Sequence, residues 1–114
     1  MTDDSRADAL ALLQRIATAD NHPYDLAIQM WQFSMRKIDP DGDWAYFPLW
    51  LLWGALTDWV ENKPTETMQA EEAMREAAKG FLNVAGDDAS ERAYFDHWLY
   101  ERLGYERTEH SDRP

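Results

Sequence analysis

One charge-free run of aromatic and aliphatic residues most restricts how this chain can fold. It covers residues 44–56, reads WAYFPLWLLWGAL and contains no Asp, Glu, Lys or Arg over its thirteen positions. A helix that crosses a bilayer needs about 20 apolar residues, so this run is too short to span a membrane. We therefore expect it to form a helix that is buried within a folded domain.

Helix-stopping residues and helical periodicity divide the rest of the chain. Pro23 suits the first turn of a helix, Gly42 belongs to a turn, and Gly104 suits the end of the last helix. No segment alternates apolar and polar residues as a half-exposed strand does. The pattern predicts an all-α bundle of about five helices, with a central, mostly buried, Trp-rich third helix. The expected helices cover residues 5–19, 24–38, 43–61, 65–84 and 89–103.

Length and composition predict one domain. The chain has 114 residues, of which 45% are hydrophobic, and this excludes intrinsic disorder for most of it. We expect a single helical domain over residues 1–104, followed by a polar, frayed tail at residues 105–114. Because the chain has no Cys, disulfides, Cys-ligated zinc and thiol catalysis are excluded. Its acidic first residues do not resemble a signal peptide, so we expect a cytoplasmic protein.

The acidic charge limits the partners that this protein can bind. The chain has 22 Asp and Glu against 11 Lys and Arg, which gives a formal net charge of −11. Duplex nucleic acid and anionic membranes attract cationic surfaces, so we expect no direct binding to either of them. Three interpretations of the charge stay open: solubility, adaptation to salt, or a surface complementary to a basic protein.

No motif in the sequence predicts catalysis. The serines lie outside any Gly-x-Ser-x-Gly context, no Gly-rich loop suits a phosphate, and no Glu-x-x-His pair suits a metal in a helical bundle. His97 lies on the side of the last helix opposite Phe95 and Trp98, which predicts an exposed histidine rather than a metal ligand or a catalytic base. We therefore expect neither an enzyme nor a cofactor or metal site.

Three aspartates form an acidic turn between the second and third helices. Asp39, Asp41 and Asp43 have the alternate spacing that opens an EF-hand calcium loop. The sixth and twelfth places of such a loop need Gly and Glu, but Trp44 and Trp50 stand there. We therefore favour an interhelical turn in which Asp43 caps the next helix.

The tryptophan content is the most unusual part of the composition. Six Trp residues give more aromatic surface than a five-helix core of this size readily hides. Helical periodicity places four of them in the core: Trp31, Trp53, Trp59 and Trp98. Trp44, Tyr46 and Trp50 lie beside the acidic turn, and we expect these three to pack against a partner. His97 and Tyr100 form a second, smaller patch on the outward side of the last helix.

These features predict a non-enzymatic, acidic helical binding protein. The expected partner is a basic protein, such as a nuclease or another nucleic-acid-binding protein, because aromatic rings beside carboxylates suit an Arg- or Lys-rich surface. In size, charge and helix content the chain is similar to small acidic helical inhibitors, including immunity proteins that neutralise nuclease toxins, although no motif carries this similarity. The predicted partner-binding residues are Asp39, Asp41, Asp43, Trp44, Tyr46, Trp50, His97 and Tyr100.

Two other functions stay open at this point. A small molecule would bind in an aromatic-lined cavity near Trp50, Trp53 and Gly54, where glycine leaves room beside the backbone. A homodimer of structural role would bury the surface of residues 44–55 against a second copy of the chain. An enclosed cavity with a few inward polar groups favours the first function, and a strictly monomeric protein excludes the second.

Overall fold

A computed structural model describes residues 3–20 and 22–104, and the regular structure in them is entirely helical. The α-helices are α1 (Asp3–Ala17), α2 (Tyr24–Ile38), α3 (Phe47–Asn62), α4 (Thr67–Val84) and α5 (Asp88–Asp96). Two 3₁₀ helices, η1 (Trp44–Tyr46) and η2 (Pro64–Glu66), precede α3 and α4, and a π-helix, η3 (His97–Arg102), continues α5. The prediction of an all-α bundle with five helices is confirmed. The tail expected at residues 105–114 lies outside the described residues.

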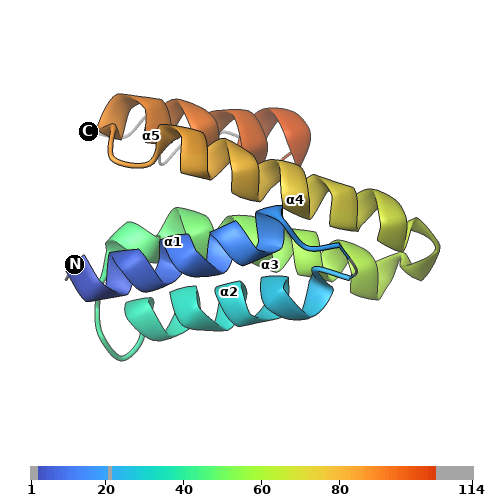
Figure 1. Cartoon of the computed structure of the whole chain (residues 1–114), viewed down its shortest axis with the longest axis horizontal. Helices are drawn as coiled ribbons and strands as arrows, with labels where there is room; N and C mark the ends of the chain where they lie inside the picture. Colours follow the sequence, from blue (N-terminus) through green and yellow to red (C-terminus); the bar gives the residue numbers. More distant parts are fainter. Residues whose placement is uncertain (1–2, 21, 105–114) are drawn as a thin grey trace.

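Four helices form a bundle, and the fifth packs on its outside (Figure 1). Both α1 and α3 contact α2 and α4, so the bundle closes through these four helices. The last helix, α5, packs against α4, while its continuation η3 contacts α3. As a result, α3 has neighbours from α2, α4 and η3 along its length.

Helix α3 supplies the centre of the hydrophobic core. Its side chains Leu52, Trp53 and Leu56 are fully buried, and they pack in one cluster with α1, α2 and α4. Pro48 lies in the first turn of α3, where its missing N–H removes no helical hydrogen bond. The buried Thr57 hydroxyl donates to the carbonyl oxygen of Trp53 at 2.9 Å. The prediction of a mostly buried, Trp-rich third helix is therefore confirmed.

Two of the expected helices are each divided in the structure. The segment expected at 43–61 is divided into η1 and α3, and Asp43 caps the short helix because its Oδ1 accepts a hydrogen bond from the N–H of Ala45 at 3.1 Å. The segment expected at 89–103 changes from α-helix to π-helix at His97. Within the π-helix the Arg102 guanidinium lies 4.2 Å from the Trp98 ring centroid and also pairs with Glu76 of α4 at 2.7 Å. These contacts tie the end of η3 to α4.

The four tryptophans expected in the core divide into two pairs. Trp53 and Trp98 are buried, as expected. Trp31 and Trp59 are only partly buried and pack against the outside of the core. The indole N–H of Trp59 donates to Glu66 at 2.7 Å, so this ring edge is used inside the chain. Trp31 instead borders a groove between α2 and α3.

Tyr94 makes the stability of the bundle sensitive to alkaline pH. Its buried hydroxyl donates to the carbonyl oxygen of Ala77 at 2.6 Å, and burial raises the pKa of Tyr94 well above its ordinary value of 10.0. Above pH 10 the unfolded chain loses this proton while the folded chain keeps it, so stability is complete below pH 10 and falls above it. We expect this group alone to lower the free energy of unfolding by about 1.4 kcal/mol per pH unit above its unfolded pKa.

Urea unfolding between about pH 9 and 11 measures this effect, because this range spans the ordinary tyrosine pKa of about 10. The Tyr94→Phe protein is expected to be less stable at neutral pH by about 1 kcal/mol, because the carbonyl of Ala77 loses its donor. Its stability is also expected to fall less steeply with alkaline pH than that of the wild type. Equal slopes for the two proteins would contradict the role given to Tyr94.

Candidate protein-interaction surface

Three aromatic side chains form a continuous ridge where η1 joins α3. Trp44, Phe47 and Trp50, here called the aromatic ridge, are spaced three residues apart and therefore share one side of the helix. The ring centroids of Trp44 and Phe47 lie 6.0 Å apart, and those of Phe47 and Trp50 lie 5.6 Å apart. Trp44 is 65% exposed and Phe47 is 38% exposed, while Trp50 is half-buried. Trp44 therefore exposes a large aromatic surface that folding of this chain does not bury.

Tyr46 does not belong to this ridge. The expectation that it packs against a partner is wrong, because Tyr46 is only 2% exposed and lies in the core. Its ring meets the edge of Phe33 of α2 with 5.8 Å between ring centroids. Burial is the main cause that raises the pKa of Tyr46, and the Asp43 carboxylate adds to it. Tyr46 is therefore an anchor that fixes η1 on α2 and so sets where Trp44 and Phe47 point.

The acidic turn lies next to Trp44, but part of its charge is used inside the chain. Asp41 pairs with Lys37 at 3.4 Å, and Asp43 caps η1. Asp39 is exposed at the end of α2. Among the described residues, no group of three or more His, Asp or Glu side chains is arranged to hold a metal ion. The turn thus contributes a local negative charge beside the ridge, and Lys37 neutralises part of it.

A groove between α3 and α5 borders the ridge at Phe47. Its volume is about 410 Å³. Three carboxylates and one guanidinium line it together with a larger set of apolar side chains, which include Phe47, Pro48, Leu51, Phe95, Leu99 and Tyr100; the charged residues are Asp88, Glu91, Asp96 and Arg92. This α3–α5 groove joins Tyr100 to the aromatic ridge. Tyr100, which was expected in a separate patch, is therefore part of the same surface as the ridge.

His97 lies outside this surface. It is exposed, as the sequence predicts, and its Nδ1 lies 3.4 Å from a carboxylate oxygen of Glu101. Its ring contacts Trp98 edge-on with 6.2 Å between ring centroids. Tyr100 lines the α3–α5 groove, whereas His97 does not. The geometry thus separates His97 from Tyr100, its expected neighbour in the second patch.

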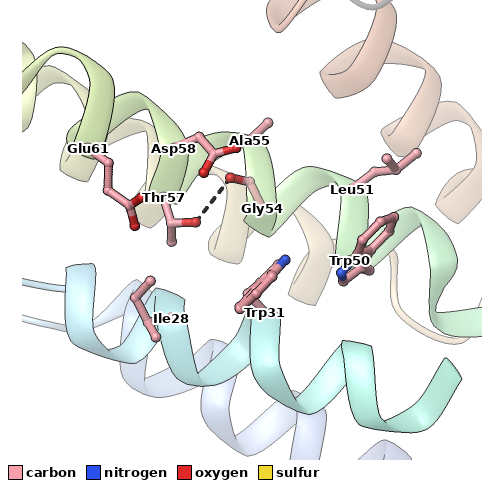
Figure 2. Close-up of a pocket in the computed structure, with 9 residues that line it drawn as sticks. All are labelled: Ile28, Trp31, Trp50, Leu51, Gly54, Ala55, Thr57, Asp58 and Glu61. Atoms are coloured by element: carbon pink, nitrogen blue, oxygen red, sulfur yellow. Dashed lines mark hydrogen bonds between the residues drawn. The ribbon is translucent and has the colours of Figure 1, made fainter. Parts of the chain in front are cut away.

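A second groove lies between α2 and α3 on the Trp50 side of the ridge (Figure 2). Its volume is about 290 Å³. Trp31 and Trp50 lie toward one end of this α2–α3 groove, and Asp58 and Glu61 lie toward the other (Figure 2). Glu61 accepts a hydrogen bond from the Tyr24 hydroxyl at 2.8 Å. Burial, followed by this hydrogen bond, raises the pKa of Tyr24.

Gly54 gives the α2–α3 groove its shape. A Cβ atom at this position would lie only 3.1 Å from Cδ1 and Nε1 of Trp31, so glycine lets the indole approach the backbone of α3. The indole nitrogen of Trp50 is buried and has no hydrogen-bond partner among the described residues. From the sequence, an aromatic cavity was expected near Trp50, Trp53 and Gly54. Trp31 takes the place of Trp53 in it, because Trp53 is sealed within the core.

Four of the residues that this surface contains beyond the predicted ones are central to its chemistry. Phe47 follows Trp44 by three residues, so helical spacing alone would have placed it on the ridge. Asp58 and Glu61 follow Gly54 by four and seven residues, which also puts them on one helix face. The fourth is Trp31, which packs across from another helix, and no local spacing in the sequence indicates such a contact.

Comparisons with known proteins add no relatives. No protein-family model, no curated protein and no solved structure matches this chain. In the part of the chain that the structure describes, no helix is both long enough and apolar enough to cross a membrane. The geometry of the ridge and its two grooves is therefore the basis for the function proposed below.

Proposed function

We propose that this protein binds a basic protein partner through the aromatic ridge and the two grooves beside it. The observation that carries the proposal is the exposed indole of Trp44. This ring is the first of the three contacting rings of the ridge and lies next to the acidic turn. Tryptophan is enriched among the residues that dominate binding energy at protein interfaces. An exposed Trp that packs against a second ring is well placed to anchor a partner's surface.

Charge supports a basic partner rather than an acidic or neutral one. The chain has a formal net charge of −11, and carboxylates line both grooves that flank the ridge. Such a field accelerates encounter with a cationic surface and disfavours anionic partners. Carboxylates can also take the place of nucleic-acid phosphates on a basic protein. The proposal therefore includes inhibition of a nuclease or another nucleic-acid-binding protein, in the cytoplasm and without catalysis by this chain.

Affinity capture from the native cells tests this proposal. The wild-type protein is immobilised, and captured proteins are identified at about 50 mM and about 300 mM salt, because ion screening separates electrostatic partners from others. We expect a basic, nucleic-acid-binding protein that is retained at low salt and largely released at high salt. Addition of the purified chain should also inhibit the partner's binding to nucleic acid. If the captured proteins are acidic or neutral and unaffected by salt, the proposal is wrong.

Self-association is a second candidate, and the exposed Trp44 supports it too. A homodimer would bury the ridge against a second copy and need no other protein. Sedimentation of the wild-type protein at micromolar concentration separates the two candidates. A monomer supports the basic partner, whereas a dimer that Trp44→Ala converts to a monomer would assign the ridge to self-association.

A further inference from the structure

We infer that the α2–α3 groove takes an arginine side chain of the basic partner. This inference rests on the proposed function and gives one of its grooves a specific occupant. The groove shares Trp50 with the aromatic ridge, so a protein seated on the ridge also reaches the mouth of the groove. Two indoles at one end and two carboxylates at the other end are the groups that recognise a guanidinium.

Within the described residues, neither carboxylate of the groove forms an ion pair, although Asp58 also lines a neighbouring pocket with Lys63 and Arg102. Asp58 and Glu61 stand three residues apart on α3 and therefore face the same side. No Lys or Arg is among the residues that line the groove, and no ion pair of either carboxylate is found in the described part of the chain. The hydrogen bond that Glu61 accepts in the described part of the chain comes from a neutral group, the Tyr24 hydroxyl. Two neighbouring carboxylates that form no ion pair there favour a cation from outside.

The indoles select for the shape of the cation. Trp31 contacts the backbone at Gly54, between Trp50 and the carboxylates, so an entering side chain passes it (Figure 2). A guanidinium is planar, stacks on aromatic rings and bonds carboxylates with two parallel N–H groups, whereas an ammonium is a compact, strongly hydrated charge. The groove therefore favours arginine over lysine.

The length of the groove fits a side chain that is still attached to a peptide. Asp58 follows Trp50 by eight residues, which is about 12 Å along the helix axis. An extended arginine side chain with a hydrogen bond at its tip covers most of this length. The buried Trp50 N–H faces the Trp31 side of the groove (Figure 2), and it has no acceptor among the described residues. Once the Trp50 ring turns enough to expose this N–H, a carbonyl oxygen of the arginine's own peptide unit provides one.

Titration with N-acetyl-arginine methylamide tests the inference. Binding is followed by the NMR signals of the indole N–H groups, with N-acetyl-lysine methylamide as the comparison. We expect the arginine probe to shift the Trp31 and Trp50 signals and to bind about fivefold more tightly than the lysine probe. Shifts confined to other tryptophans, or equal binding of the two probes, would overturn the inference.

Charge-neutral variants separate the groove from the net charge. The double variant Asp58→Asn, Glu61→Gln is expected to bind the arginine probe and the captured partner about tenfold more weakly than the wild type. The control Asp20→Asn, Glu72→Gln loses the same two charges at exposed positions that line neither groove, and it should bind as the wild type does. Circular dichroism confirms that both variants are folded.

The failure of this inference differs from the failure of the proposed function. If the partner binds the wild type and both double variants equally, the arginine site is wrong and the proposed function stands. If the arginine probe binds the groove but no basic protein is captured, the occupant is a free guanidinium compound. That result overturns both the partner as the source and the proposed function.

Discussion

Replacement of Trp44 by alanine is expected to weaken binding of the basic partner about thirtyfold, because removal of a tryptophan that anchors an interface as a hot spot costs about 2 kcal/mol or more. Trp44 is the most exposed ring of the ridge, at 65%, and it contacts Phe47 rather than the core. The loss should therefore appear in binding and not in folding. We expect the free energy of unfolding to change by less than about 0.5 kcal/mol, as for other exposed positions. Calorimetric titration gives the Kd, and urea unfolding gives the stability.

Met68→Ala is the matched control for this variant. Met68 is 83% exposed, more than Trp44, and it lies in the first turn of α4, near the opposite end of α3. Helix α3 has 16 residues, so the two side chains are separated by about 24 Å along its axis. We expect Met68→Ala to leave the Kd unchanged. If both variants weaken binding equally, exposed apolar surface in general explains the effect and the ridge has no specific role.

Replacement of Trp53 by alanine is expected to have the largest effect on stability. Trp53 is fully buried at the centre of α3, where it packs with side chains from the neighbouring helices. Its removal leaves a cavity in the core, and Trp→Ala changes at such sites cost about 3–5 kcal/mol. A domain of this size has about 5–15 kcal/mol of stability in total. We therefore expect a clearly lower urea midpoint and a lower Tm.

Trp44→Ala is also the control for this second prediction, because the two variants delete the same side chain. The difference between their free energies of unfolding measures burial alone, without a change in chemistry. We expect that difference to be about 3 kcal/mol or more. If the two proteins unfold at the same urea concentration, α3 is not the centre of the core.

The sequence allowed prediction of the fold because its signals are local. Helical periodicity and the prolines and glycines between segments indicated five helices, and the second helix begins and ends where it was expected, at Tyr24–Ile38. The change from α-helix to π-helix at His97 could not be predicted in this way. It accompanies contacts of Arg102 with Trp98 and with Glu76 of another helix, which are set by packing.

The candidate site could be predicted only in part. Trp44 lies beside the acidic turn and on the surface, as expected, since both features follow from neighbours in the sequence. Tyr46 was misplaced because it lies only two positions after Trp44, and the 3₁₀ turn directs its side chain inward onto Phe33. Tyr100 reaches the ridge through the packing of α5 and η3, which no spacing along the chain indicates.

Amide hydrogen exchange on the complex with the captured basic partner tests the central claim most directly. The ridge and the α3–α5 groove beside it should gain protection when the partner binds, so slower exchange is expected over residues 41–51 and 95–100. Helix α1 should exchange at the same rate in the free and the bound protein. Protection that is confined to α1, with unchanged exchange over residues 41–51, would contradict the claim that the aromatic ridge is the binding surface.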